Sequence, residues 1–590
     1  MGRNRIEVRN HLIAFFEIIA DLCIMIADND KSGLLNLARL MKKRGIKHLI
    51  ISPGSRNAPV VSVFCNDPFF ECLVIVDERS AAFFALGIAM KLQKPAAIVC
   101  TSGSAALNYA PAVAEAYYQH VPLIILTADR PVEWIDQGDG QTIRQKEVFR
   151  NYVKASYELP ETIRSQDDRW FNDRLVSEAL NAAIFPTAGP VHINLPFTEP
   201  LYGFSMETEN EPKTIDIAET GHTLSAKTIT SLKKDWEKTS RKLILVGQQF
   251  PGHNTSDLLE KLANFGDVVV LTETTSNLNN PRFISTIDRC LAAIGKDTEA
   301  YEPELLVTFG GHIVSKKIKT FLRNAAIKTH WHIDPVDWQM DTYQHLTTGI
   351  PMKADAFLEQ LMPKLYSSKN NFNAIWQHAN TKAAEHHHSF IAQAKYSDLK
   401  VFDMLLNTIP QHYDIHLANS TPVRYAQLFD FKKSYNFYSN RGTSGIDGCS
   451  STAVGSCFAV QKPSLLITGD LAFFYDSNAF WNPYVSPFLK VIIINNQGGG
   501  IFRFIDGPAK TGLLESHFEA RHQTRAKNLA ATYGLHYFEA DSLESLTKIL
   551  PEFYKPQSKA ALLEIQTPPE ASSEQLVTYF KFMARAADQT

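Results

Sequence analysis

Several features are scarce or missing in this 590-residue sequence, and each absence narrows the possible functions. Lys and Arg together number 59 against 62 Asp and Glu, so the chain lacks the basic excess typical of nucleic-acid-binding proteins. Any recognition of anions must therefore come from local clusters of cations. No G-x-G-x-x-G sequence follows a first predicted strand, which argues against a dinucleotide-dependent dehydrogenase.

Cysteine is also scarce. The seven cysteines are an odd number and form no Cys-x-x-Cys pair. They are Cys23, Cys65, Cys72, Cys100, Cys290, Cys449 and Cys457, and most of them lie in apolar runs. This pattern favours reduced thiols in the core of a cytoplasmic protein over a disulfide framework.

A long uninterrupted hydrophobic run is missing too. The most apolar segment, His11–Ala27, is too short for a membrane span and contains Glu17 and Asp21. A signal peptide is conceivable because arginines precede the segment, but the two acids and the lack of a clear small-residue cleavage site argue against it. We expect residues 1–30 to be an N-terminal extension, either an amphipathic helix or a stretch upstream of a start at Met25.

What is present is the composition of a globular protein, with 45% hydrophobic and 21% charged residues. Short apolar runs alternate with helical stretches, which predicts parallel sheets buried on both faces. The predicted strands are 48–52, 72–76, 96–100, 122–127, 243–247, 268–272, 305–311, 415–420, 464–470, 491–496 and 561–566. The fold class is therefore α/β, with three parallel-sheet domains at 31–203, 223–365 and 398–590.

Two polar stretches, at about 204–222 and 366–397, separate the three blocks and are expected to be structurally weak. The second contains three consecutive histidines, His386, His387 and His388. Consecutive helical residues point in different directions, so the three cannot share one metal ion. We expect them to form a solvated face.

Polar side chains follow two strands of the last block. Asp470 ends one predicted strand, and Asn495 and Asn496 end the next, with 25 residues between Asp470 and Asn496. Adjacent parallel strands would bring these oxygen atoms together, and Mg²⁺ prefers such ligands and shares them with phosphates. Glycines 498–500 allow a tight turn near the ligand. Taken singly, Asp470 could be a helix cap and the asparagines a turn; the combination favours a metal site.

Glu78 follows the predicted strand 72–76 and opens an apolar helix. Such an acid is often only a favourable charge at a helix N-terminus. A carboxyl group with a raised pKa in a dry pocket would instead suit proton transfer.

Gly469-Asp470 followed by Asn495-Asn496 resembles the signature of thiamine-diphosphate-dependent enzymes. The resemblance implies that Asp470, Asn496 and the Gly498 carbonyl bind Mg²⁺ or Mn²⁺ with the cofactor diphosphate, and that Glu78 activates the cofactor. It also implies the thiamine-diphosphate-binding fold, with pyrimidine-binding, middle and diphosphate-binding domains. In the family, the first domain of one subunit meets the last domain of another, so a homodimer or a dimer of dimers is implied. Leu471 departs from the second glycine of many members, which points to one subfamily.

Further segments are similar to the members of this family that act in menaquinone biosynthesis, over about residues 32–570. They are ISPGSRNAP (51–59), TSGSAALNYAPAVAEA (101–116), LTADRP (126–131), GDGQTIRQ (138–145), SNRGTSGIDG (439–448) and NNQGGGIF (495–502). The resemblance implies a transferase that decarboxylates 2-oxoglutarate and adds the remaining carbanion to isochorismate.

The same resemblance implies the site residues of that reaction. Ile446 would support the bent cofactor, and Gln497 replaces an asparagine of many relatives. The implied substrate-binding residues are Ser55, Arg56, Gln141, Lys316, Lys317, Ser420, Arg424, Arg441, Ile501 and Phe502. Arginine suits bidentate recognition of the substrates' carboxylates.

Three alternatives stay open at this point. The chain could be another thiamine-diphosphate decarboxylase or carboligase, similar to acetolactate synthase. It could be a non-catalytic cofactor-binding sensor, although Glu78, Asp470 and Asn496 together argue against that. Lys316 and Lys317 could simply belong to an exposed helix face.

Overall fold

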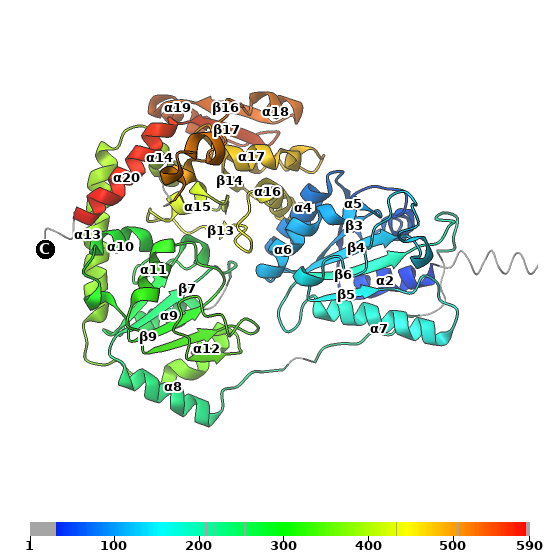
Figure 1. Ribbon diagram of the computed structural model, residues 1–590, viewed down its shortest axis with the longest axis horizontal. Helices are drawn as coiled ribbons and strands as arrows, with labels where there is room; N and C mark the ends of the chain where they lie inside the picture. Colours follow the sequence, from blue (N-terminus) through cyan, green and yellow to red (C-terminus); the bar gives the residue numbers. More distant parts are fainter. Residues whose placement is uncertain are drawn as a thin grey trace, which may run out of the picture. The chain divides into compact units, whose positions relative to one another are not determined.

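A computed structural model describes residues 31–206, 211–218, 220–252, 255–431, 433–503 and 507–585 (Figure 1). The expected N-terminal extension, its amphipathic helix and the start at Met25 lie outside these residues. The chain divides into two compact units, with the boundary between residues 218 and 219. Each unit is described separately below.

The first unit is built on a six-stranded parallel sheet in the order β2-β1-β3-β4-β6-β5. Its strands are β1 (His48–Ile51), β2 (Glu71–Val74), β3 (Ala96–Cys100), β4 (Leu123–Asp129), β5 (Ala155–Glu158) and β6 (Val191–Pro196). Its helices are α2 (Ser32–Lys43), α3 (Ala58–Cys65), α4 (Glu78–Leu92), α5 (Ser104–Asn108), α6 (Ala110–Tyr118) and α7 (Gln166–Ala182). Helices α2, α3 and α7 share one hydrophobic cluster with the sheet, while α4 packs on β1 and β3.

The second unit contains two parallel sheets. The first has five strands in the order β11-β10-β9-β7-β8. These strands are β7 (Lys242–Val246), β8 (Val268–Thr272), β9 (Leu305–Phe309), β10 (Thr329–Ile333) and β11 (Thr348–Ile350). The accompanying helices are α8 (Ala226–Lys238), α9 (Thr255–Ala263), α10 (Ile287–Ile294), α11 (Lys316–Asn324) and α12 (Ala354–Leu361).

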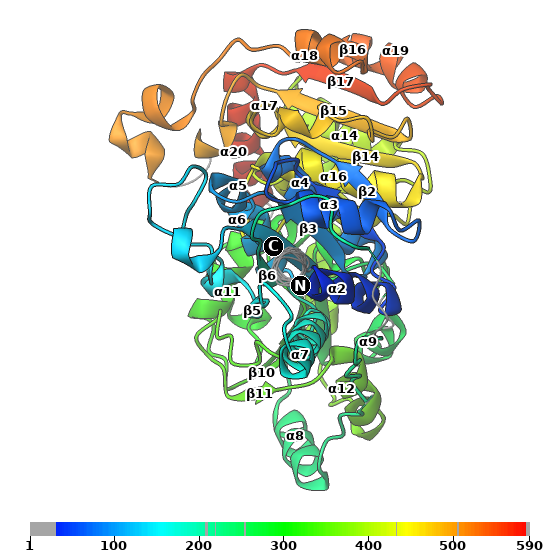
Figure 2. The same cartoon turned by 90° about the vertical axis from the view of Figure 1, so that its right-hand side faces the viewer.

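The last sheet has six parallel strands in the order β13-β12-β14-β15-β17-β16, and Figure 2 shows β14, β15 and β17 in succession. Its strands are β12 (Asp414–Leu417), β13 (Asn436–Tyr438), β14 (Ser464–Gly469), β15 (Leu489–Asn495), β16 (His536–Ala540) and β17 (Ala561–Gln566). Helix α13 (Phe372–Gln393) packs on α10 and β8 as well as on α20. The helices that accompany the last sheet are α14 (Asp398–Thr408), α15 (Thr421–Ala426), α16 (Cys449–Val460), α17 (Asp470–Tyr475), α18 (Lys527–Thr532), α19 (Leu543–Phe553) and α20 (Pro569–Arg585).

Three parallel sheets confirm the predicted α/β class, and every predicted strand is present. The domain boundaries stay a prediction. The part of the chain after residue 218 forms one compact unit, which contains both the second and the third predicted domain. Strands such as β6 and β10 were not predicted, because their buried histidines break the apolar pattern. Thr127 Oγ1 lies 2.7 Å from His192 Nε2, and Thr308 Oγ1 lies 2.8 Å from His330 Nε2. A threonine on the neighbouring strand thus gives one ring nitrogen of each buried imidazole a hydrogen-bond partner.

Two expectations were wrong. Residues 366–397 are not structurally weak, because α13 occupies most of them. His387 is not solvated: it is 2% exposed, and its Nδ1 lies 2.9 Å from the hydroxyl of Tyr579 on α20. Burial lowers the pKa of His387 to about 3, so its imidazole is neutral. His388 on the same helix is exposed, as expected.

The six cysteines of the described residues are free, but Cys65 is exposed and Cys72 half-buried, so these two are not core thiols. Within the part of the chain that the structure describes, none of the helices combines the length and the apolar character needed to cross a membrane.

Candidate functional site

Glu78 lies where the sequence predicts it, at the first position of α4 behind the carboxyl end of β2. Asp77 caps the helix, because its side chain accepts a hydrogen bond of 3.0 Å from the Ser80 N–H. Burial raises the pKa of the half-buried Glu78 carboxyl group, and Asp77 adds to the effect. The carboxyl group is therefore shifted in the direction that proton transfer near neutral pH requires.

Arg56 follows the carboxyl end of β1 and is only 5% exposed. Its guanidinium group donates to the Phe197 carbonyl at 3.0 Å and forms an ion pair of 3.1 Å with Glu199. The first unit itself thus holds this arginine in place, whereas the neighbouring Ser55 is exposed.

Gln141 lies in an exposed loop that follows β4. The loop packs closely on Gly103, where an added Cβ would lie 3.2 Å from the Gln141 backbone. Gln145 also contacts Gly103, because its Oε1 accepts a hydrogen bond of 2.8 Å from the Gly103 N–H. Ser55, Arg56, Glu78 and Gln141 therefore all follow carboxyl ends of strands in one sheet, the usual ligand-binding edge.

In the second unit, Asp470 and Asn496 follow the paired strands β14 and β15, in which Gly469 lies opposite Ile494. Asp470 is 2% exposed and Asn496 7%. The Gly498 N–H donates to Asp470 Oδ2 at 2.9 Å. Gly498 has a φ of +150°, and an added Cβ would lie 2.7 Å from the Glu519 carbonyl, so a side chain is excluded there. The two loops proposed to hold a metal are thus in direct contact.

Two residues at this place carry no signal in the sequence. Asp398, 1% exposed, accepts from Asn496 Nδ2 at 2.9 Å and also from Thr567 and Ser572. Because the amide nitrogen is held by Asp398, the amide oxygen of Asn496 is the atom left for a cation. His522 Nε2 lies 3.3 Å from Asp470 Oδ2, and this carboxylate raises the pKa of His522.

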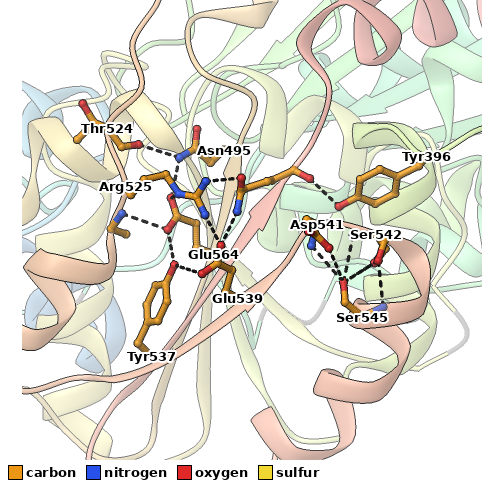
Figure 3. A network of polar contacts seen from close by, with 12 residues as sticks. Tyr396, Asn495, Thr524, Arg525, Tyr537, Glu539, Asp541, Ser542, Ser545 and Glu564 are labelled. Carbon is orange, nitrogen blue, oxygen red and sulfur yellow. Dashed lines mark hydrogen bonds and ion pairs between the residues drawn. The ribbon is translucent and has the colours of Figure 1, made fainter.

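A second polar network fixes the end of β15 (Figure 3). Asn495 Nδ2 donates to the Glu564 carboxylate at 2.6 Å and to the Thr524 carbonyl at 3.1 Å. Glu564 is fully buried and also accepts from the Tyr537 hydroxyl at 2.6 Å. Asn495 is therefore a structural residue that anchors the strand end, and only its neighbour Asn496 is available as a ligand.

The donors at this edge suit a divalent metal with a diphosphate. They comprise a carboxylate, an amide oxygen oriented by hydrogen bonding and backbone carbonyls of a glycine-rich turn, which are the hard oxygen ligands that Mg²⁺ takes. Burial raises the pKa of the Asp398 carboxyl group, its hydrogen bonds from Thr567, Asn496 and Ser572 oppose this rise, and the nearby charge of Asp470 adds to it. The residues present fit the proposed group.

A cavity of about 810 Å³ lies in the same unit. Four residues proposed from the sequence line it: Lys316, Lys317, Arg424 and Ile501. The Lys317 ammonium lies 4.5 Å from the ring centroid of Phe580, another lining residue. Burial lowers the pKa of Arg424, and the positive charge of Arg441 adds to this shift. The cavity thus gathers cations that are well placed for an anionic ligand.

The remaining proposed residues lie at neighbouring loops of the last sheet. Arg441 is 6% exposed and donates to Asn419 Oδ1 at 2.7 Å. The Ser420 carbonyl accepts from Arg424 at 2.6 Å. Ile446 and Phe502 are half-buried. The structure does not place Ile446, Phe502 or Arg441 among the residues lining the 810 Å³ cavity.

Comparisons with known proteins agree with these features. Residues 33–148 match the family model "Thiamine pyrophosphate enzyme, N-terminal TPP binding domain". Residues 218–417 match "Middle domain of thiamine pyrophosphate".

Curated relatives match nearly the whole length of the chain. A 2-succinyl-5-enolpyruvyl-6-hydroxy-3-cyclohexene-1-carboxylate synthase of Porphyromonas gingivalis is 42% identical over 565 residues, which is 94% of this chain and 98% of the relative. The enzymes of the same name from Flavobacterium johnsoniae and Christiangramia forsetii are each 43% identical, over 92% and 93% of this chain and 98% of each relative. The chain therefore belongs to the thiamine-diphosphate-dependent family of 2-succinyl-5-enolpyruvyl-6-hydroxy-3-cyclohexene-1-carboxylate synthases.

Proposed function

We propose that this chain decarboxylates 2-oxoglutarate and transfers the four-carbon remainder to isochorismate. The product is 2-succinyl-5-enolpyruvyl-6-hydroxy-3-cyclohexene-1-carboxylate, an intermediate of menaquinone biosynthesis. The observation that carries this proposal is the cavity lined by Lys316, Lys317 and Arg424 in a chain that matches synthases of this name over nearly its whole length.

The charge of the cavity supports this choice of substrates. 2-Oxoglutarate and isochorismate each carry two carboxylates, and a carboxylate entering a partly dry site needs counterions or strong donors. Four cationic side chains and a single acid, Asp288, line the cavity; the cations are those of Lys316, Lys317, Arg424 and Lys581. A decarboxylase with small apolar substrates would have no use for this excess of positive charge.

Bound thiamine diphosphate supplies the electron sink that decarboxylation and acyl transfer require. We assign Asp470, Asn496 and the Gly498 carbonyl to the Mg²⁺ or Mn²⁺ that holds its diphosphate, and Ile446 to the support of its rings. Glu78 holds the proton that activates the cofactor, and its raised pKa supports this role.

The other assigned residues bind the substrates. Lys316, Lys317, Arg424 and Arg441 neutralise carboxylates, together with Arg56. Ser55, Gln141 and Ser420 supply hydrogen bonds, while Ile501 and Phe502 form an apolar wall. We further propose a homodimer or a dimer of dimers. The cytoplasmic location expected from the cysteines stays a prediction.

One experiment tests the activity. The purified chain is incubated with thiamine diphosphate, Mg²⁺, 2-oxoglutarate and isochorismate, and the products are identified by mass spectrometry. We expect the succinyl adduct and release of carbon dioxide, both dependent on isochorismate and 2-oxoglutarate together. Pyruvate replaces 2-oxoglutarate in a parallel reaction. Efficient product formation from pyruvate, with none from 2-oxoglutarate, would favour an enzyme similar to acetolactate synthase instead.

A further inference from the structure

We propose that Glu273 is a positioning residue that sets the place of Lys316 and Lys317, and thereby the binding of the anionic substrate. This inference rests on the proposed function and deepens it. Glu273 directly follows β8, 43 residues before Lys316 in the sequence, and is 2% exposed. It does not line the 810 Å³ cavity, so it acts through the backbone that carries the lysines.

A bidentate contact joins the Glu273 side chain to the loop that precedes α11. Glu273 Oε2 accepts from the Val314 N–H at 2.7 Å, and Oε1 accepts from the Ser315 N–H at 2.7 Å. Both carboxylate oxygens are thus used on two successive backbone donors. Such bidentate, charge-assisted hydrogen bonds are stronger than neutral ones and fix geometry as well as distance.

Ser315 connects the backbone held by Glu273 to helix α11. It is the N-cap residue of α11, and its Oγ accepts from the Ile318 N–H at 3.1 Å. The same hydroxyl donates to Asp288, which lines the cavity. Lys316 and Lys317 are the first two residues of α11, so their Cα positions depend directly on the place of Ser315. The carboxylate of Glu273 therefore fixes the start of the helix that presents both lysines.

The surroundings make this contact sensitive to pH. Burial raises the pKa of Glu273 to about 7, Asp288 of α10 adds to the rise, and the two backbone donors and Arg441 oppose it. The other groups that face Glu273 electrostatically are Lys319 of α11, Arg424 of α15 and Tyr343. Above pH 7 the ionised carboxylate accepts both hydrogen bonds. Below pH 7 the protonated group becomes a donor at one oxygen and loses one of them.

The test uses Glu273→Gln in the full-length chain with thiamine diphosphate and Mg²⁺. The glutamine keeps the size of the side chain but can offer only one acceptor atom to the two N–H groups. Glu304→Gln is the matched control, because Glu304 also accepts a hydrogen bond from a backbone N–H, that of Ser240 at 2.7 Å. Glu304 precedes β9 and so lies at the amino end of that strand, whereas Glu273 follows the carboxyl end of β8. The measurements are kcat and KM for each substrate between pH 6 and 8.5, and backbone hydrogen exchange over residues 312–319.

For Glu273→Gln we expect KM for one of the two anionic substrates to rise at least tenfold, while kcat changes less than threefold. Exchange over 312–319 should become faster, and the increase of KM that we expect for the wild type below pH 7 should disappear. The control should match the wild type in all three. Glu273→Asp, which keeps the charge on a shorter side chain, should restore the pH dependence even if the glutamine variant does not fold.

Two results would overturn the inference. One is KM for both substrates within threefold of the wild type at every pH, whether or not hydrogen exchange changes. The other is unchanged exchange over 312–319, because the carboxylate would then not hold the loop. Hydrogen exchange needs no substrate, so it tests the contact even if the wild type makes no product, a result that would reject the proposed function instead.

Discussion

Arg424→Ala tests the anionic character of the cavity most directly. Arg424 lies among like charges, with Lys316 and Lys317 on the same cavity and Arg441 near enough to lower its pKa. A substrate carboxylate relieves this repulsion and is recognised by the guanidinium fork. Loss of a buried charge-pair contact costs about 2–5 kcal/mol. Because the cavity is partly open and the lysines remain, we take the lower end, about 2 kcal/mol, which corresponds to a roughly 30-fold loss of kcat/KM.

The assay is steady-state kinetics, with one substrate varied at saturating levels of the other. Arg424 also donates to the Ser420 carbonyl, so thermal unfolding must show that the variant keeps its fold. Arg282→Ala is the control, since Arg282 is an exposed arginine of the same unit whose side chain is 53% accessible. Arg424→Lys keeps the positive charge without the forked guanidinium group. Its kcat/KM should therefore lie between the values of Arg424→Ala and the Arg282→Ala control. If Arg424→Ala kept kcat/KM within threefold for both substrates, the cavity would not be the anionic substrate site.

Three further predictions follow from the geometry. Glu78→Gln should keep the circular dichroism spectrum of the wild type and lose nearly all turnover. Activity within about threefold of the wild type, a change of less than roughly 0.7 kcal/mol in the activation free energy, would refute the role of Glu78 in activating the cofactor. Asp398→Ala should weaken Mg²⁺-dependent binding of thiamine diphosphate about tenfold in calorimetry, less than Asp470→Ala, because it removes only the partner that orients Asn496. His387 has a pKa of about 3 when folded, below its ordinary value of 6.5, so it stabilises the fold above pH 6.5 and less as the pH falls towards 3. The wild type should therefore lose unfolding free energy between pH 6.5 and 4.5, and His387→Gln should make this loss smaller by up to about 1.4 kcal/mol per pH unit. Denaturant titrations at several pH values measure the difference. An unchanged dependence of the unfolding free energy on pH would contradict the burial of a neutral imidazole.

The class of the fold, and the edge of each sheet at which the proposed site residues lie, follow from the pattern of apolar and polar residues along the chain. Apolar runs separated by helical stretches can bury both faces only as parallel strands, and parallel strands have all their carboxyl ends at one edge. Asp470 and Asn496 could therefore be placed side by side before any coordinates, and Glu78 at the start of its helix. The resemblance to the family signature added the roles that we propose for these residues.

The distant polar group that holds each proposed site residue could not be predicted from the sequence and is visible in the folded chain alone. Asp398 orients Asn496 across 98 positions of sequence, and Glu273 holds residues 41 and 42 positions away. His387, taken for a solvated residue, is buried against α20. These pairings depend on how helices and loops pack over the sheets, and local periodicity carries no information on that packing. A buried polar group needs a partner, but its own sequence neighbourhood does not say which segment will supply it.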